Sequence, residues 1–172
     1  FPYTTLFRSG SHVHWDRKLD ALLAQAVTAS IPTNTAIVEV AVVEPPAGFR
    51  AHRMGGAFIE HVGPLYVSTE GGVFRLGFRV LAQHTNPLGI CHGGMMATFA
   101  DMLLPMAVLY RWEGERRFLP TISLQVDYLG PSRLGAWVEG RGELLRRTRN
   151  MIFAQGLVTA DGEPVLRVSG TF

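Results

Sequence analysis

Residues 95–112 read MMATFADMLLPMAVLYRW, an apolar run that contains one carboxylate, Asp101, and one proline, Pro105. If the run is helical, apolar residues recur on nearly every side, and such a helix has no face suited to water, so it must be buried. The polar stretch 113–115 (EGE) follows and predicts the end of the helix. This helix decides the fold, because the rest of the domain must enclose it.

Short β-rich runs lie on both sides of this helix in the sequence. In the run 73–80, apolar residues alternate with two arginines and a glycine, which is the period of a strand with one buried face. We predict a short helix at 57–61 and strands at 65–69, 73–80, 121–128, 136–145, 149–160 and 164–172. One buried helix wrapped by a curved antiparallel sheet of about five to six strands satisfies both patterns, and this α+β arrangement resembles the hotdog architecture by analogy.

Composition sets the broad class. The chain has 172 residues, of which 47% are hydrophobic and 17% charged, so a single domain with a real core is expected. A net charge of +2 does not favour nucleic acid as a partner. The lone Cys91 excludes an internal disulfide, and no apolar run reaches the ~20 residues of a membrane span. These features predict a cytoplasmic protein without a membrane partner.

The first part of the chain has a different character. Residues 1–9 (FPYTTLFRS) resemble the translation of a short-read sequencing adapter, so we exclude them from the fold. In residues 10–42, apolar spacing allows a helix at 16–30, but translated upstream sequence with accidental periodicity explains it equally well. The hotdog domain is therefore predicted to span residues 43–172.

Asp101 is the polar group that does not suit a buried helix. An ionised carboxylate in hydrocarbon costs several kcal/mol unless it is paired or lines a cavity. Gly93 and Gly94 stand at the helix entrance, where free N–H groups can hold a developing oxyanion. The alternative is that Asp101 caps a neighbouring loop. Pro105 cannot donate to the Asp101 carbonyl, so the helix is expected to bend or loosen there.

Residues 86–101, NPLGICHGGMMATFAD, resemble the signature of the PaaI-type hotdog acyl-CoA thioesterases. The shared features are Asn86, a His-Gly-Gly that begins six residues later at His92, and Asp101 nine residues after the histidine. The similarity extends through the segments 58–66, 119–131 and 161–172, so it covers roughly residues 45–172. It implies a hydrolase that cleaves acyl-CoA to the free acid and CoA.

The resemblance also implies roles for single residues. Asp101 would act as general base on water or as nucleophile on the thioester, with Thr121 holding the nucleophilic water. The Gly93 N–H would polarise the thioester carbonyl, and Gly94 would allow its close approach.

Asn86 would hydrogen-bond the carbonyl or the water, and His92 would orient the loop or contact the thioester. In the family, Asn86 and residues 92–94 of one chain face Asp101 and Thr121 of the other. The resemblance therefore implies a homodimer or homotetramer.

Arg146, Arg147 and Arg149, called here the hairpin arginines, lie where the family meets the nucleotide of CoA. They can pair with its phosphates, although a solvated basic edge strand is the equal alternative. No cofactor is implied, since thioesters are activated, and the histidine spacing predicts no metal site. Two other functions remain open: a non-catalytic acyl-CoA-binding hotdog regulator, and a hydratase acting on enoyl-CoA.

Overall fold

The computed structural model describes residues 44–53, 55–113 and 118–172. The predicted adapter stretch 1–9 and the leader 10–42, with its predicted helix at 16–30, lie outside the described residues. The elements in chain order are β1 (Arg50–His52), α2 (Ala57–Val62), β2 (Leu65–Ser68), the 3-10 turn η1 (Glu70–Gly72), β3 (Arg75–Arg79), the 3-10 turn η2 (Ala82–His84), α3 (Gly93–Tyr110), β4 (Ser123–Tyr128), β5 (Trp137–Arg147), β6 (Ile152–Ala160) and β7 (Glu163–Thr171).

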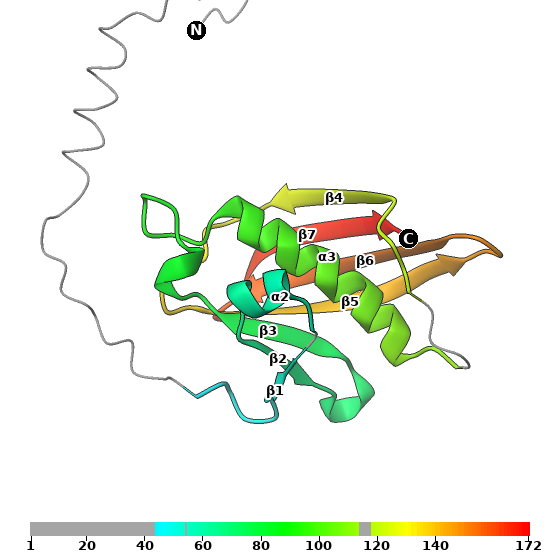
Figure 1. The fold of residues 1–172 in the computed structure, drawn as a ribbon, viewed down its shortest axis with the longest axis horizontal. Helices are drawn as coiled ribbons and strands as arrows, with labels where there is room; N and C mark the ends of the chain where they lie inside the picture. Colours follow the sequence, from blue (N-terminus) through cyan, green and yellow to red (C-terminus); the bar gives the residue numbers. More distant parts are fainter. Residues whose placement is uncertain (1–43, 54, 114–117) are drawn as a thin grey trace, which may run out of the picture. The chain divides into compact units, whose positions relative to one another are not determined.

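The strands form one antiparallel sheet in the order β1-β2-β3-β5-β6-β7-β4, with α3 lying across one face (Figure 1). The predicted α+β hotdog class is confirmed. The sheet has seven strands rather than five to six, because β1 adds a strand of three residues that is too short to show a period in the sequence. The strand that follows α3, β4, pairs with β7 alone and forms the edge opposite β1.

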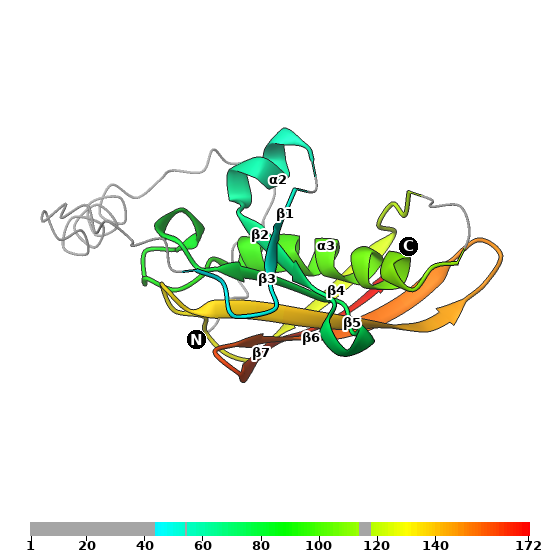
Figure 2. The ribbon, with the colours of Figure 1, turned by 90° about the horizontal axis from the view of Figure 1, so that it is seen from below.

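The core lies between α3 and the inner face of the sheet. Figure 2, turned by 90°, shows α2 and α3 on the same side of β5, β6 and β7. Phe99, Leu103 and Leu104 of α3 are fully buried, and each such side chain contributes about 1.5–3 kcal/mol through its removal from water. The helix can approach this closely because β5 has a glycine beneath it. A Cβ built on Gly140 would stand only 2.5 Å from Leu103 Cδ2.

One side of α3 is incompletely covered. Nine of its residues are buried, but Ala97, Asp101, Pro105 and Leu109, spaced four apart, are only half-buried. The expectation that the helix is enclosed on every side is therefore wrong for a single chain.

By length and composition alone α3 could cross a bilayer, with 18 residues of mean hydropathy 1.3, yet half of it is buried in the protein. The helix also runs unbroken through Pro105.

Candidate active site

The loop before α3 is shaped by Asn86. Its backbone N–H donates to the Ile90 carbonyl at 2.9 Å, and its Oδ1 accepts from the Leu88 N–H at 2.9 Å. These two bonds fix the side chain against the loop. Among the described residues, no acceptor contacts the side-chain amide nitrogen, so its hydrogens are available to a ligand.

His92 caps the first turn of α3. Its Nδ1 accepts from the Gly94 N–H at 2.8 Å, and its carbonyl accepts from the N–H groups of Met95 and Met96 at 2.9 and 3.2 Å. The remaining N–H of the first turn is that of Gly93, and the residues that the structure describes offer it no acceptor. A free N–H at the positive end of a long helix is suited to hold an oxyanion.

The two glycines serve this turn differently. A Cβ on Gly94 would stand 2.9 Å from His92 Nδ1, so a side chain there would displace the cap. A Cβ on Gly93 would stand 3.4 Å from the ring of Tyr128, which is ordinary van der Waals contact. Tyr128 also donates its hydroxyl to the Gly93 carbonyl at 2.8 Å. Tyr128 was not predicted as a site residue, because its contact with Gly93 arises only when β4 packs beside the start of α3 in the folded chain.

Asn86, Gly93 and Tyr128 line a cavity of about 340 Å³ together with Cys91, Ser132 and other residues. We call Asn86 and residues 92–94 the loop half-site. Burial raises the pKa of the Cys91 thiol to about 11, so the sulfur is protonated at neutral pH. A protonated, buried thiol is a poor nucleophile, and the chemistry of this cavity must come from other groups.

Asp101 and Thr121 form the second predicted cluster, called here the carboxylate half-site. The Thr121 hydroxyl donates to Asp101 Oδ1 at 2.6 Å. Asp101 is half-buried on the incompletely covered side of α3, and Thr121 is exposed just before β4. The structure thus brings together two residues that lie 20 positions apart in the chain.

The two half-sites of one chain do not meet. Gly93 and Asp101 are separated by eight residues of continuous helix, which corresponds to about 12 Å along the axis. The cavity that Asn86 and Gly93 line does not include Asp101. A single ligand carbonyl therefore cannot contact both half-sites within one chain.

The hairpin arginines lie at the tip of the β5–β6 hairpin, and all three are exposed. The Arg147 guanidinium stacks 4.0 Å from the centre of the Trp112 ring, just beyond the end of α3. Both residues line a cavity of about 520 Å³, with Ala107, Val108 and Leu144 on its apolar side. Stacking uses the face of a guanidinium and leaves its N–H edge available to an anion.

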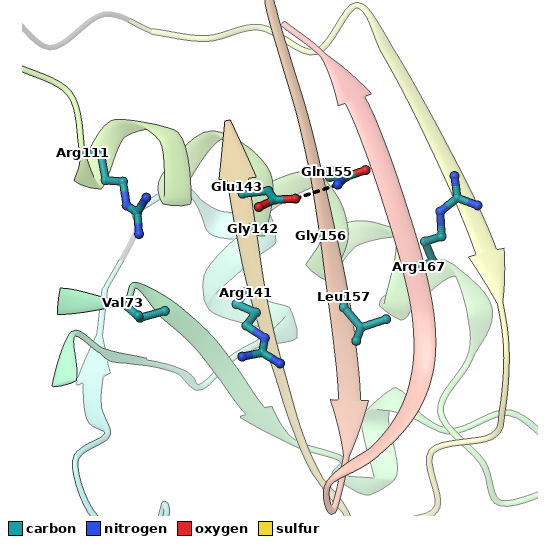
Figure 3. Close-up of a pocket in the computed structure, with 9 residues that line it drawn as sticks. All are labelled: Val73, Arg111, Arg141, Gly142, Glu143, Gln155, Gly156, Leu157 and Arg167. Carbon is teal, nitrogen blue, oxygen red and sulfur yellow. Dashed lines mark hydrogen bonds between the residues drawn. The ribbon is translucent and has the colours of Figure 1, made fainter. Parts of the chain in front are cut away.

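A further cavity, of about 480 Å³, was not anticipated from the sequence (Figure 3). Gly140 faces α3, so Arg141 and Glu143 project from the opposite face of β5. Figure 3 shows Arg141 on β5 and Arg167 on β7 beside this cavity, with the Gln155 amide donating to Glu143 at 2.6 Å. None of the predicted site residues lines it. In residues 44–53, 55–113 and 118–172, no three His, Cys, Asp or Glu side chains gather as metal ligands do.

Comparison with known families gives one match to a family model. Residues 88–166 match the model described as thioesterase superfamily. This segment contains the loop half-site except Asn86, the whole carboxylate half-site and the hairpin arginines.

Individual proteins show the same similarity. A Pseudomonas aeruginosa protein named "Putative esterase" is 26% identical over 128 residues, which is 74% of this chain and 95% of that protein. Mouse acyl-coenzyme A thioesterase 13 is 29% identical over 76 residues, 44% of this chain, and the match covers 53% of the mouse protein.

Among solved structures, a mutant of the phenylacetic acid degradation protein PaaI from Thermus thermophilus is similar, with a TM-score of 0.57 and 27% identity. That match covers 67% of this chain and 96% of the other.

Proposed function

Because the chain belongs to the thioesterase superfamily, among the PaaI-type hotdog thioesterases, we propose that it hydrolyses acyl-CoA thioesters to the free acid and CoA. The observation that carries this proposal is the 2.6 Å hydrogen bond from Thr121 to Asp101. It holds a carboxylate at a half-buried position on an otherwise apolar helix. Such a group is costly to keep for stability alone, and its chemistry suits activation of water.

In the proposed reaction, the Gly93 N–H binds the thioester oxygen as it becomes negatively charged. Asp101 removes a proton from a water that Thr121 holds; the water attacks the thioester carbon, and the C–S bond breaks to release CoA, which takes up the proton. Alternatively, the Asp101 carboxylate attacks the carbon and displaces CoA, and water then hydrolyses the resulting anhydride. Asn86 donates to the carbonyl or to the water through its free amide. His92 acts by capping the turn, since its Nδ1 already accepts from Gly94. A base and an oxyanion donor each contribute about two or more orders of magnitude in rate.

The site is completed by a second copy of the chain. The half-buried side of α3 exposes part of Ala97 and Leu109 around Asp101, and apolar residues in that position favour contact with a partner. The adjacent edge strand β4 has one unpaired side, with Ile122 and Tyr128 more than half exposed at its ends. Covering this surface with a second copy would bring its loop half-site to the carboxylate half-site of the first. The assembly is thus proposed to be a homodimer or homotetramer.

The hairpin arginines are proposed to bind the phosphates of CoA. The end of α3 at Tyr110 lies about 13.5 Å along the helix axis from Asp101, and Trp112, on which Arg147 stacks, follows two residues later. An extended pantetheine arm can bridge that separation, with its thioester at Asp101 and its phosphates at the hairpin. The free N–H edge of Arg147 would then pair with a phosphate.

The direct test is the Asp101→Asn variant in an assay of thiol release from a panel of acyl-CoAs. Asn is nearly isosteric and can still accept from Thr121, so the fold should persist while base and nucleophile are lost. We expect kcat to fall about a hundredfold or more. If Asp101→Asn hydrolyses acyl-CoA at the wild-type rate, the proposed mechanism is wrong. If the wild-type chain binds acyl-CoA without releasing thiol, the non-catalytic regulator is the better assignment.

A further inference from the structure

His84 is a buried residue whose two ring nitrogens both make hydrogen bonds. It lies at the end of η2 and is 3% exposed. Its Nδ1 accepts from the Leu81 N–H at 3.0 Å, and its Nε2 lies 2.9 Å from the Val62 carbonyl. Since Nδ1 accepts, the ring is neutral, and the proton on Nε2 is donated to Val62. The ring also packs edge-on against Phe78, with centroids 5.3 Å apart.

These bonds attach α2 to the loop after β3. Val62 is the last residue of α2, and the neighbouring Gln83 donates its side-chain amide to the carbonyls of His61 and Gly63 at 3.2 and 3.0 Å. Three consecutive carbonyls at the end of α2 are therefore held by Gln83 and His84. No residue of α2 is fully buried, so these bonds contribute much of what holds the helix end in place.

The backbone of His84 makes a second connection, to the loop half-site. Its carbonyl accepts from the His92 N–H at 2.7 Å, closing the base of the loop that carries Asn86. Between α2 and the start of α3 lies a cavity of about 350 Å³, lined by Val62 and His84 together with His92 and Gly94. One residue thus contacts both α2 and the segment that positions the Gly93 N–H.

We propose that neutral His84 is a positioning residue that fixes the loop half-site against α2, and that protonation of its ring releases this connection. An imidazolium carries a hydrogen on both nitrogens, so Nδ1–H would point at the Leu81 N–H and their bond would be lost. The effect on turnover rests on the proposed hydrolase function. The connection itself does not, since it can be measured without substrate.

The surroundings of His84 favour the neutral ring. Burial lowers the pKa of His84 below its usual 6.5, and the nearby backbone carbonyls of Val62 and Arg79, which favour the charged ring, offset only part of that effect. The titratable side chains facing the same cavity are His61 from α2 and His92 from α3, and no carboxylate is among the described residues that line it. From β3, the neighbours are the Phe78 ring and the Arg79 backbone.

The sign of the pH dependence follows from this lowered pKa. Below pH 6.5 the unfolded chain binds a proton at His84 that the folded chain resists. The stability contribution is therefore complete above that pH and is lost progressively as the pH falls toward the folded pKa. Local opening of α2 and of the loop should precede global unfolding in the same range, because these segments depend on His84 directly.

The test is hydrogen exchange of residues 57–63 and 85–93 in the full chain between about pH 5 and pH 7.5, corrected for intrinsic exchange. In the wild type, protection of both segments should fall together as the pH drops. His84→Gln, which keeps one acceptor and one donor but cannot titrate, should remove the pH dependence. His84→Leu should lose protection at every pH and reduce kcat about tenfold with little change in KM, on the scale of one lost hydrogen bond.

Matched variants separate His84 from its neighbours. Gln83→Met should weaken protection of residues 57–63 at all pH values and leave the pH dependence intact. His61→Gln should change neither, because only its backbone carbonyl takes part. Wild-type protection that stays constant over the range, or His84→Gln with the wild-type pH dependence, overturns the proposal. Loss of activity in Asp101→Asn bears on the proposed function alone.

Discussion

If each site is built from two chains, two inactive variants should restore each other. Asn86→Ala removes the amide of the loop half-site, and Asp101→Asn removes the base of the carboxylate half-site. The helix places Gly93 and Asp101 of one chain about 12 Å apart, and in the proposed dimer each site would draw one half from each chain. A mixed dimer then has one site with both defects and one intact site. After random reassociation of an equal mixture, about half of the dimers are mixed, and activity per chain should reach about a quarter of wild type.

That recovery is easily distinguished from background. Asp101→Asn alone should retain about a hundredth of the wild-type kcat or less. The two chains, given different affinity tags, are co-refolded, and the mixed dimers isolated over two columns should have about half the wild-type activity per chain. Mixed dimers shown by mass to contain both chains, yet no more active than the variants, would refute a site shared between chains. Recovery in a mixture of Asp101→Asn with Thr121→Ala, both from one half-site, would refute it equally.

Three further predictions address other parts of the chain. Replacing all hairpin arginines with alanine should raise KM for acyl-CoA but leave an acyl-N-acetylcysteamine substrate unaffected, because that substrate has no phosphates; equal losses on both would indicate misfolding. Gly94→Ala should displace the His92 cap and lower stability by about 1 kcal/mol, measured as a drop in Tm of roughly 3–5 °C, whereas Gly93→Ala should keep the wild-type Tm. A chain that begins at Val43 should match the full chain in solubility, oligomeric state and activity, and a monomeric or insoluble product would contradict the predicted domain boundary.

The fold was largely predictable because its signals are periodic and local. The alternation in residues 73–80 is that of a strand with one buried face, and Arg75–Arg79 of that run form β3, which pairs antiparallel with β2. Strand β1 was not predicted, because three residues at a sheet edge make hardly one full alternation and most of them are exposed. The close approach of Leu103 to Gly140 also has no sequence signal, since it depends on which strand happens to lie beneath the helix.

For the candidate site, the sequence supplies predicted residues but not their geometry. Resemblance to a family indicated Asp101 and Thr121, and their hydrogen bond places them together. Neither spacing nor composition could give that contact, because it depends on how the chain returns to β4 after α3. The role of His92 as a cap and the reach of Tyr128 to Gly93 likewise depend on tertiary structure. Gly94 was expected to allow close approach of the substrate. In the structure, a side chain at this position would also collide with the His92 cap.

A single chain does not bury α3 on every side, and this difference from the sequence-based expectation bears on the proposed assembly. An apolar pattern around the whole of α3 predicts burial on every side, yet the stripe containing Ala97, Asp101 and Leu109 is only half-buried. Apolar residues left half-exposed in this stripe support the proposed contact with a second copy of the chain. Asp101 lies in that stripe, and covering it with a second copy would exclude bulk water and place the carboxylate beside the partner's loop half-site. Electrostatic interactions strengthen in such a water-poor environment, so assembly and catalysis would depend on the same surface.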